Sequence, residues 1–134
     1  MELRYIHKTL RDSAVLTNSY VAATVLGPQG VGSQADPAEN NQLNFYINFT
    51  LGDLTSAEFK VEFSDDGTTY YQETVSSISS GTSTDTVLEH TLSATGNYRV
   101  PISLVDRHIR ISVKGTGTVT SSLMAVEVIL GIRP

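Results

Sequence analysis

The sequence contains no cysteine. Disulfide frameworks, thiolate zinc sites and cysteine nucleophiles are therefore excluded together, and stability has to come from packing or from assembly with other chains. Long apolar runs are missing as well. The best one, residues 123–132, is much shorter than the roughly 18 apolar residues that cross a bilayer, and it contains Glu127. We expect no membrane segment and interpret this run as a buried strand covered on both faces.

Positive charge is also scarce. Nine Lys and Arg residues against fourteen Asp and Glu residues give a formal net charge of -5 at pH 7. Such a chain lacks the basic field that concentrates phosphate groups, since only Arg107, Arg110 and Lys114 form a local basic cluster. We expect no nucleic-acid binding. The first ten residues lack the apolar core of a secretion signal, which predicts that the protein is made in a cytoplasm.

The sequence is rich in alternation of apolar and polar residues with a period of two. With 134 residues, 40% of them hydrophobic, the chain has the size of one domain with its own core. Residues 57–63 alternate in this way, so Glu58 and Glu62 are predicted to face outward from a half-buried strand. Strands are predicted at 43–51, 57–63, 69–75, 87–92, 97–104, 108–114 and 123–132, and less regularly within 14–27. The inward positions of three of these strands predict one shared core: Phe45, Ile47, Phe49, Phe59, Val61, Phe63, Ile109, Ile111 and Val113.

About eight short strands with turn residues between them, and no amphipathic helix, indicate an all-β fold. The architecture is predicted to be an antiparallel β-sandwich, and the pattern leaves open whether it is jelly-roll-like or immunoglobulin-like. We expect a single domain over residues 1–134, with an N-terminal arm over 1–12 and a long surface loop over 27–41. A second polar stretch, residues 76–86, is predicted to be a loop as well.

The segment EFSDDGTTYY, residues 62–71, looks more like a site than any other part of the sequence. Asp65 and Asp66 can cap their own turn, and Gly67 can take the positive φ that a tight hairpin requires. A calcium loop would need a ladder of acidic ligands with a distal glutamate, and the spacing lacks it. We therefore interpret the segment as a structural turn and expect no metal ligands in it.

Catalytic patterns are weak in the rest of the sequence. His7, His90 and His108 are far apart along the chain, and none is spaced to share a metal with another. The serines are numerous, but none lies in a Gly-x-Ser-x-Gly elbow. We assign no catalytic residue, metal ligand or cofactor and expect a protein that is not an enzyme.

Three short motifs give the sequence a family resemblance. They are a Phe-Ser-x-Asp-Gly turn followed by an aromatic, a Gly-x-Tyr-Arg element, and the strand and turn IRISVKGTG at residues 109–117. The run that contains them, residues 41–122, covers nearly two-thirds of the chain and resembles small β-sandwich virion structural proteins of tailed bacteriophages. Discoidin-like carbohydrate-binding modules share the turn and the Ile-Arg-Ile strand. Those modules usually carry a tryptophan and often a disulfide, and this sequence has neither.

This resemblance implies a capsid decoration, or cement, protein. Such a protein would be synthesised in the host cytoplasm and would bind the outer surface of the major capsid protein shell as a homotrimer, with no nucleic acid or membrane as partner. Two alternatives stay open: a structural component of the neck or tail, and a carbohydrate-binding module displayed on the virion.

A decoration protein needs residues that reach its neighbours. Tyr70 and Tyr71 should point to opposite faces of a strand, one toward the core and the other outward as a contact residue. The apolar side chains of the N-terminal segment would be costly to leave in water, and the 27–41 loop is long enough to reach another chain. The predicted partner contacts are Leu3, Tyr5, Ile6, Pro28, Val31 and Tyr71.

Overall fold

The computed structural model describes residues 4–26, 42–102 and 108–132. Within these ranges the chain forms strands and no helix, and every strand pairing is antiparallel. No helix long and apolar enough to cross a membrane occurs in this part of the chain. The strands are β1 (Arg4–Ala14), β2 (Val21–Ala22), β3 (Gln42–Thr50), β4 (Leu54–Ser64), β5 (Tyr71–Gln72), β6 (Thr74–Ser79), β7 (Thr82–Val87), β8 (His90–Leu92), β9 (Gly96–Ile102), β10 (His108–Gly117) and β11 (Leu123–Ile132).

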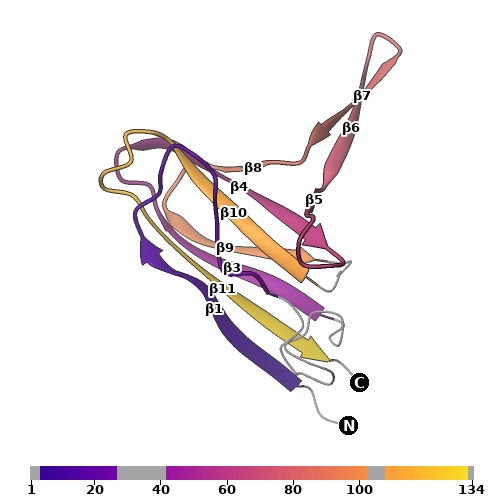
Figure 1. Cartoon of the computed structure of the whole chain (residues 1–134). Helices are drawn as coiled ribbons and strands as arrows, with labels where there is room; N and C mark the ends of the chain where they lie inside the picture. Colours follow the sequence, from indigo (N-terminus) through magenta and orange to yellow (C-terminus); the bar gives the residue numbers. More distant parts are fainter. Residues whose placement is uncertain (1–3, 27–41, 103–107, 133–134) are drawn as a thin grey trace.

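Two sheets form the body of the molecule (Figure 1). One has the strand order β1-β11-β3-β9, and the other has the order β2-β10-β4-β5, with β8 also paired to β4. The first half of the chain thus pairs with the second half in reverse: β1 with β11, β2 with β10, β3 with β9 and β4 with β8. This is the double-sheet arrangement of a jelly roll. The predicted all-β sandwich is confirmed, and of the two topologies left open the strand order follows the jelly roll.

The core lies between the inner faces of the two sheets. The alternation of apolar and polar residues predicted nine side chains for this core. Eight of them are buried, and the ninth, Phe63, is only partly buried. Strand β11 differs from its prediction. Its side chains Val126 and Val128 are fully buried, but Leu123 is 42% exposed, so the strand is covered on one face and not on both.

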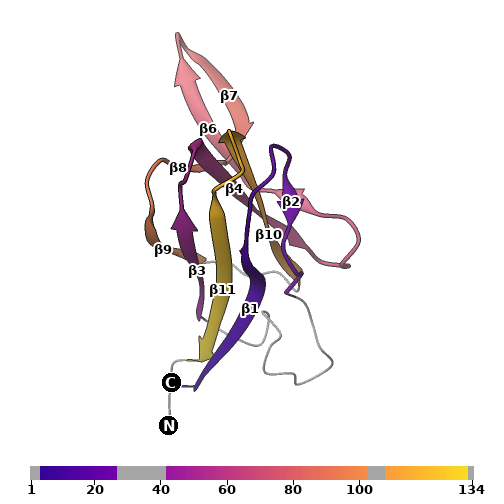
Figure 2. The same cartoon turned by 90° about the vertical axis from the view of Figure 1, so that its left-hand side faces the viewer.

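Residues 76–86 were predicted to be a loop, and the structure shows a β-hairpin instead. Strands β6 and β7 pair in an unbroken register from Thr74 with Val87 to Ser79 with Thr82. The two residues between them, Ser80 and Gly81, have φ values of 52° and 77°, and positive φ at both central positions defines the I′ turn that suits a two-residue hairpin. We call residues 74–87 the projecting hairpin, because they extend away from the sandwich in both views (Figures 1 and 2).

The N-terminal segment also differs from the expected arm. From Arg4 onward it is strand β1, which pairs with β11 along the edge of a sheet. The reason is that the backbone groups of β11 offer an unpaired edge, and strand pairing satisfies both sets of hydrogen bonds. The predicted strand within 14–27 is reduced to β2 and a single bridge from Leu26 to Ile109. The long loop over 27–41 lies outside the described residues.

Candidate functional site

Charged side chains gather on the outer face of the sheet that contains β4 and β10. Because side chains alternate along a strand, the residues between the buried core positions all point to this face. The register sets Glu62 opposite Arg110, and Glu58 opposite Lys114. We call this set the outer ladder: Glu58, Lys60 and Glu62 of β4, and Arg110, Ser112, Lys114 and Thr116 of β10.

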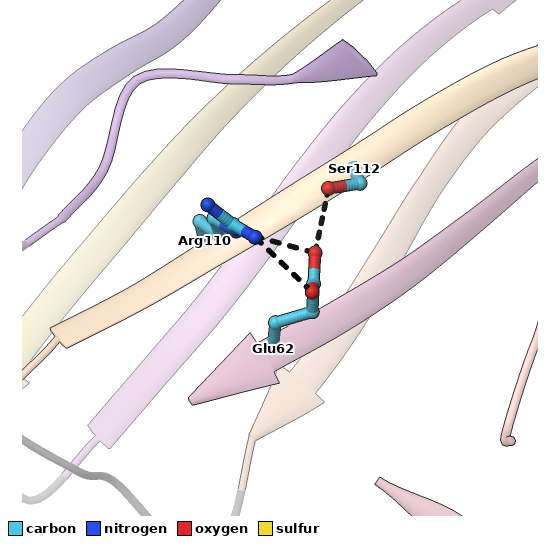
Figure 3. Close-up of polar contacts among 3 residues, drawn as sticks. All are labelled: Glu62, Arg110 and Ser112. Atoms are coloured by element: carbon cyan, nitrogen blue, oxygen red, sulfur yellow. Dashed lines mark hydrogen bonds and ion pairs between the residues drawn. The ribbon is translucent and has the colours of Figure 1, made fainter. Parts of the chain in front are cut away.

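Glu62 is held by three hydrogen bonds from β10 (Figure 3). Arg110 donates from Nε at 3.2 Å and from Nη2 at 3.3 Å, and the Ser112 hydroxyl donates at 2.7 Å. The Glu62 side chain is 6% exposed, whereas that of Arg110 is 30% exposed. Burial by itself would raise the pKa of Glu62, but the hydrogen bonds from Arg110 and Ser112 outweigh it and hold the pKa below its usual value.

Glu58 occupies the same face of β4, on the far side of Lys60 from Glu62. It is as buried as Glu62, but its partners are hydroxyl groups. Ser56 donates to one carboxylate oxygen at 2.6 Å, and Thr116 donates to the other. The sequence pattern correctly put both glutamates on the outer face and wrongly implied that this face is solvated.

Two tyrosines cover the cations of the outer ladder. The guanidinium of Arg110 lies 3.9 Å from the ring centroid of Tyr70, and Lys60 and Lys114 lie 4.5 Å and 5.0 Å from that of Tyr20. These are cation–π contacts. The Tyr20 hydroxyl donates to Glu89, and its pKa is raised by burial first and then by that carboxylate. The aromatic and aliphatic parts of these side chains explain why the two glutamates are buried on an outer face.

The outer ladder is suited to holding two strands in register and not to proton transfer. A general acid or base needs a pKa near the working pH, and the hydrogen bonds to Glu62 move its pKa away from neutrality. The tyrosine faces that a sugar ring would stack on are engaged by cations in the case of Tyr20 and Tyr70. The sequence showed the alternating charges, but the ladder depends on a register between strands far apart in the chain.

The turn after β4 is built by its own side chains, as predicted. Asp66 accepts hydrogen bonds at one carboxylate oxygen from the amides of Thr68 and Thr69, at 2.8 and 2.9 Å, and from the Ser64 hydroxyl. The bond from the Thr69 amide, followed by those from Thr68 and Ser64, lowers the pKa of Asp66. Gly67 has a φ of 79°. Of the two aspartates predicted to cap the turn, the capping role is confirmed for Asp66, and the positive φ of Gly67 is confirmed as well. The loop between β4 and β5 is wider than a two-residue turn.

The two adjacent tyrosines do point in different directions, but neither enters the core. Tyr70 packs on Arg110 at the outer ladder, and Tyr71 is 67% exposed in β5, opposite Phe63. The prediction of one inward tyrosine is wrong, because β5 is a two-residue edge strand with no second layer over it. Tyr71 lies on the core side of the sheet with Phe63 but is exposed there, so it remains accessible to a partner, and its contact role stays a prediction.

The structure describes only two of the other five predicted contact residues. The backbone of Tyr5 and Ile6 belongs to β1, opposite Gly131 and Leu130 of β11. Leu3, Pro28 and Val31 lie outside the described residues.

The histidines are not brought together. His90 stacks on the core residue Phe59, with ring centroids 4.7 Å apart, and His108 lies beside Gly67 at the far end of the same sheet. His7 belongs to β1 in the opposite sheet. Over the described ranges there is no group of three or more His, Asp or Glu side chains that could hold a metal ion.

The projecting hairpin is the second candidate surface, and the sequence did not predict it. All residues of β6 and β7 are exposed, and the main contacts of these strands are with each other. Three large apolar side chains are exposed on it, with Ile78 at 78%, Val75 at 46% and Val87 at 45%. Its only charged residue, Asp85, accepts a hydrogen bond from the Ser76 hydroxyl.

One comparison with known families gives a match. The sequence profile of the family described as CARDB, a family of β-sandwich domains, matches residues 29–114, which is more than half of the chain. This range includes the projecting hairpin and every residue of the outer ladder except Thr116. No curated protein sequence matches the chain at a significant level.

Proposed function

This chain belongs to the CARDB family of β-sandwich domains, and we propose that it is a non-enzymatic structural protein of a bacteriophage virion. In this proposal it is a capsid decoration protein that binds the outer surface of the major capsid protein shell as a homotrimer. The virion assignment rests on the resemblance of its turn and strand motifs. The contact role rests on the shape of the molecule.

The observation that carries the contact role is the projecting hairpin. A two-stranded hairpin is marginally stable in water by itself, because it has no layer to pack on. This one lies outside the core and leaves Ile78 and Val75 in solvent. Contact with another chain would bury these side chains and explain why the chain carries the element. Exposed apolar residues grouped on one projecting element are typical of protein contacts.

The outer ladder supports a structural role as well, because it holds strands β4 and β10 together. Its carboxylates and cations are engaged with groups of the same chain, so it acts as a clamp between β4 and β10. A rigid sandwich with an element that reaches outward suits a protein that joins others.

Mass spectrometry of purified virions tests the assignment. A decoration protein should have a copy number per virion that scales with the number of shell subunits. A neck or tail component would be present only in the few copies that form one ring. Binding on a glycan array would favour the alternative of a carbohydrate-binding module displayed on the virion. Absence of the protein from virions would refute the virion assignment.

A variant tests the hairpin within this function. Ile78→Asp puts a charge on the exposed hairpin and should lower the occupancy of the protein on capsids. Leu123→Asp is the matched control, because Leu123 is also exposed and apolar but belongs to β11 in the sandwich. Equal occupancy of the Ile78→Asp variant and the unmodified protein would refute the contact role.

A further inference from the structure

The other described sheet edges carry features that oppose the addition of a further strand. Strand β1 has Lys8, Arg11 and two register shifts along its length. Strand β9 has Arg99 and Pro101, and proline cannot donate a ladder hydrogen bond. Strands β2, β5 and β8 are only two or three residues long. Charges, proline, bulges and short length are the known ways in which proteins protect sheet edges.

The β6 edge of the projecting hairpin has none of these features. Its six residue pairs follow one another without a register shift, and it contains no proline, lysine or arginine. It is therefore the described element best suited to pairing with a strand of another chain through its backbone.

The register determines which backbone N–H and C=O groups of the hairpin point outward from each of its two edges. The Leu88 amide donates to the Glu73 carbonyl at 2.7 Å, so these two residues form a bonded pair. Bonded and non-bonded pairs alternate in an antiparallel ladder. Even-numbered residues of β6 therefore point their N–H and C=O groups away from β7. The residues with outward backbone groups are Thr74, Ser76 and Ile78 on β6, and Ser83, Asp85 and Val87 on β7.

We propose that β6 pairs antiparallel with β6 of a second copy of this chain, about a twofold axis at Ser76. In that register Thr74 lies opposite Ile78 of the second copy, and every outward residue of β6 has a bonded partner. The two hairpins then form one four-stranded sheet, which meets the need for three or more strands. This inference rests on the proposed contact role of the hairpin and names its partner.

Charge decides between the two edges. The middle outward residue is Ser76 on β6 and Asp85 on β7. A twofold axis on β7 would set Asp85 opposite Asp85 of the second copy, and like charges directly opposite each other are destabilising. The β6 edge is uncharged, so it is complementary to itself.

The contact is small, and the dimer is expected to be weak in dilute solution. A six-residue strand buries much less than the roughly 1,200 Å² of a standard interface. Copies held side by side on a surface would have a high effective concentration, which strengthens such a contact without any new interaction. This twofold contact is additional to the threefold contact proposed above, because it uses only the hairpin edge.

Cysteine cross-linking tests the geometry in a chain that has no other cysteine. Bonded antiparallel partners have Cα atoms about 5.5 Å apart, which is within the range of a disulfide. Oxidation of the full-length Ser76→Cys protein should give a covalent dimer about tenfold faster or more than Ser83→Cys, its matched control on the other edge. Equal rates, or faster dimerisation of Ser83→Cys, would overturn the assignment of the β6 edge.

Sedimentation over a range of concentrations gives a second and independent test. Ser76→Pro removes an outward N–H that the hairpin does not use, so the hairpin should persist while the twofold association through β6 is lost. Ser83→Pro makes the same change on the other edge and should leave self-association intact. A strictly monomeric unmodified protein, or a Ser76→Pro protein that associates as well as the unmodified one, refutes the inference. Both tests use purified protein without capsids, so their failure is distinct from a failure of shell binding.

Discussion

Replacing Glu62 by glutamine removes one charge from the outer ladder while keeping the size of the side chain. The glutamate accepts three hydrogen bonds, two from Arg110 and one from Ser112. Glutamine offers one carbonyl oxygen to these donors, and its NH₂ group then faces a donor. The substitution therefore tests what the charge contributes to the pairing of β4 with β10.

The expected cost is about 2 kcal/mol of unfolding free energy at pH 7. Hydrogen bonds to charged groups contribute about 1.5–3 kcal/mol. Breaking a fully buried ion pair costs about 3–5 kcal/mol, but that figure is too high here. The Arg110 side chain is 30% exposed, so water recovers part of the loss, and its guanidinium keeps its contact with Tyr70.

The cost should also depend on pH in a known direction. The pKa of Glu62 is lower in the folded protein than its usual value, so its contribution is fully present above the unfolded pKa of about 4.3 and is lost as pH falls through the folded pKa. The difference between the two proteins should therefore shrink below about pH 4. Asp66 also has a lowered pKa, so both proteins keep some acid sensitivity.

Urea unfolding followed by circular dichroism at pH 7 and at pH 3 measures both effects. Glu58→Gln is the matched control, because Glu58 is equally buried on the same face but is bound by hydroxyl groups that can rotate to serve an amide. It should cost less than Glu62→Gln. A loss below about 0.5 kcal/mol for Glu62→Gln, or one that is the same at both pH values, would refute the role given to the ion pair.

The remaining predictions concern the core, the turns and the N-terminal strand. Phe59→Ala should cost about 3–5 kcal/mol in urea melts, since the side chain is 2% exposed, and a loss below about 1 kcal/mol would place it outside the core. Gly52→Ala should cost about 2–4 kcal/mol, because a Cβ there would lie 2.5 Å from a backbone carbonyl oxygen at a φ of 58°. Gly81→Ala should cost only about 1 kcal/mol, because its Cβ would meet open space, so equal losses would contradict the steric argument. Deletion of residues 1–8 should lower the Tm by on the order of 10 °C, because it removes most of the β1 ladder, whereas an unchanged Tm would mean that the strand contributes nothing to the isolated domain.

The inner face of each long strand could be predicted from the sequence. Side chains alternate between two faces whatever the partner strand is, so the apolar positions of β3 and β4 had to point the same way. The turn at Gly67 was equally local, because Asp66 binds amides two and three residues along the chain. The projecting hairpin was missed for a related reason. Its serines and threonines give no apolar face, and a pattern search then sees only a loop.

The candidate surfaces depended on the tertiary structure. The outer ladder needs Glu62 opposite Arg110, and this register joins strands far apart in the chain through the wrapping of the two sheets. The burial of Glu58 and Glu62 likewise depends on Tyr20, Tyr70 and the long cationic side chains that fold over them. Local sequence determined which face of its strand each side chain takes, because backbone geometry alone sets the two-residue alternation of side chains along a strand. The fold decided what each face meets, because strand pairing and the covering of one side chain by another are set by residues distant in sequence.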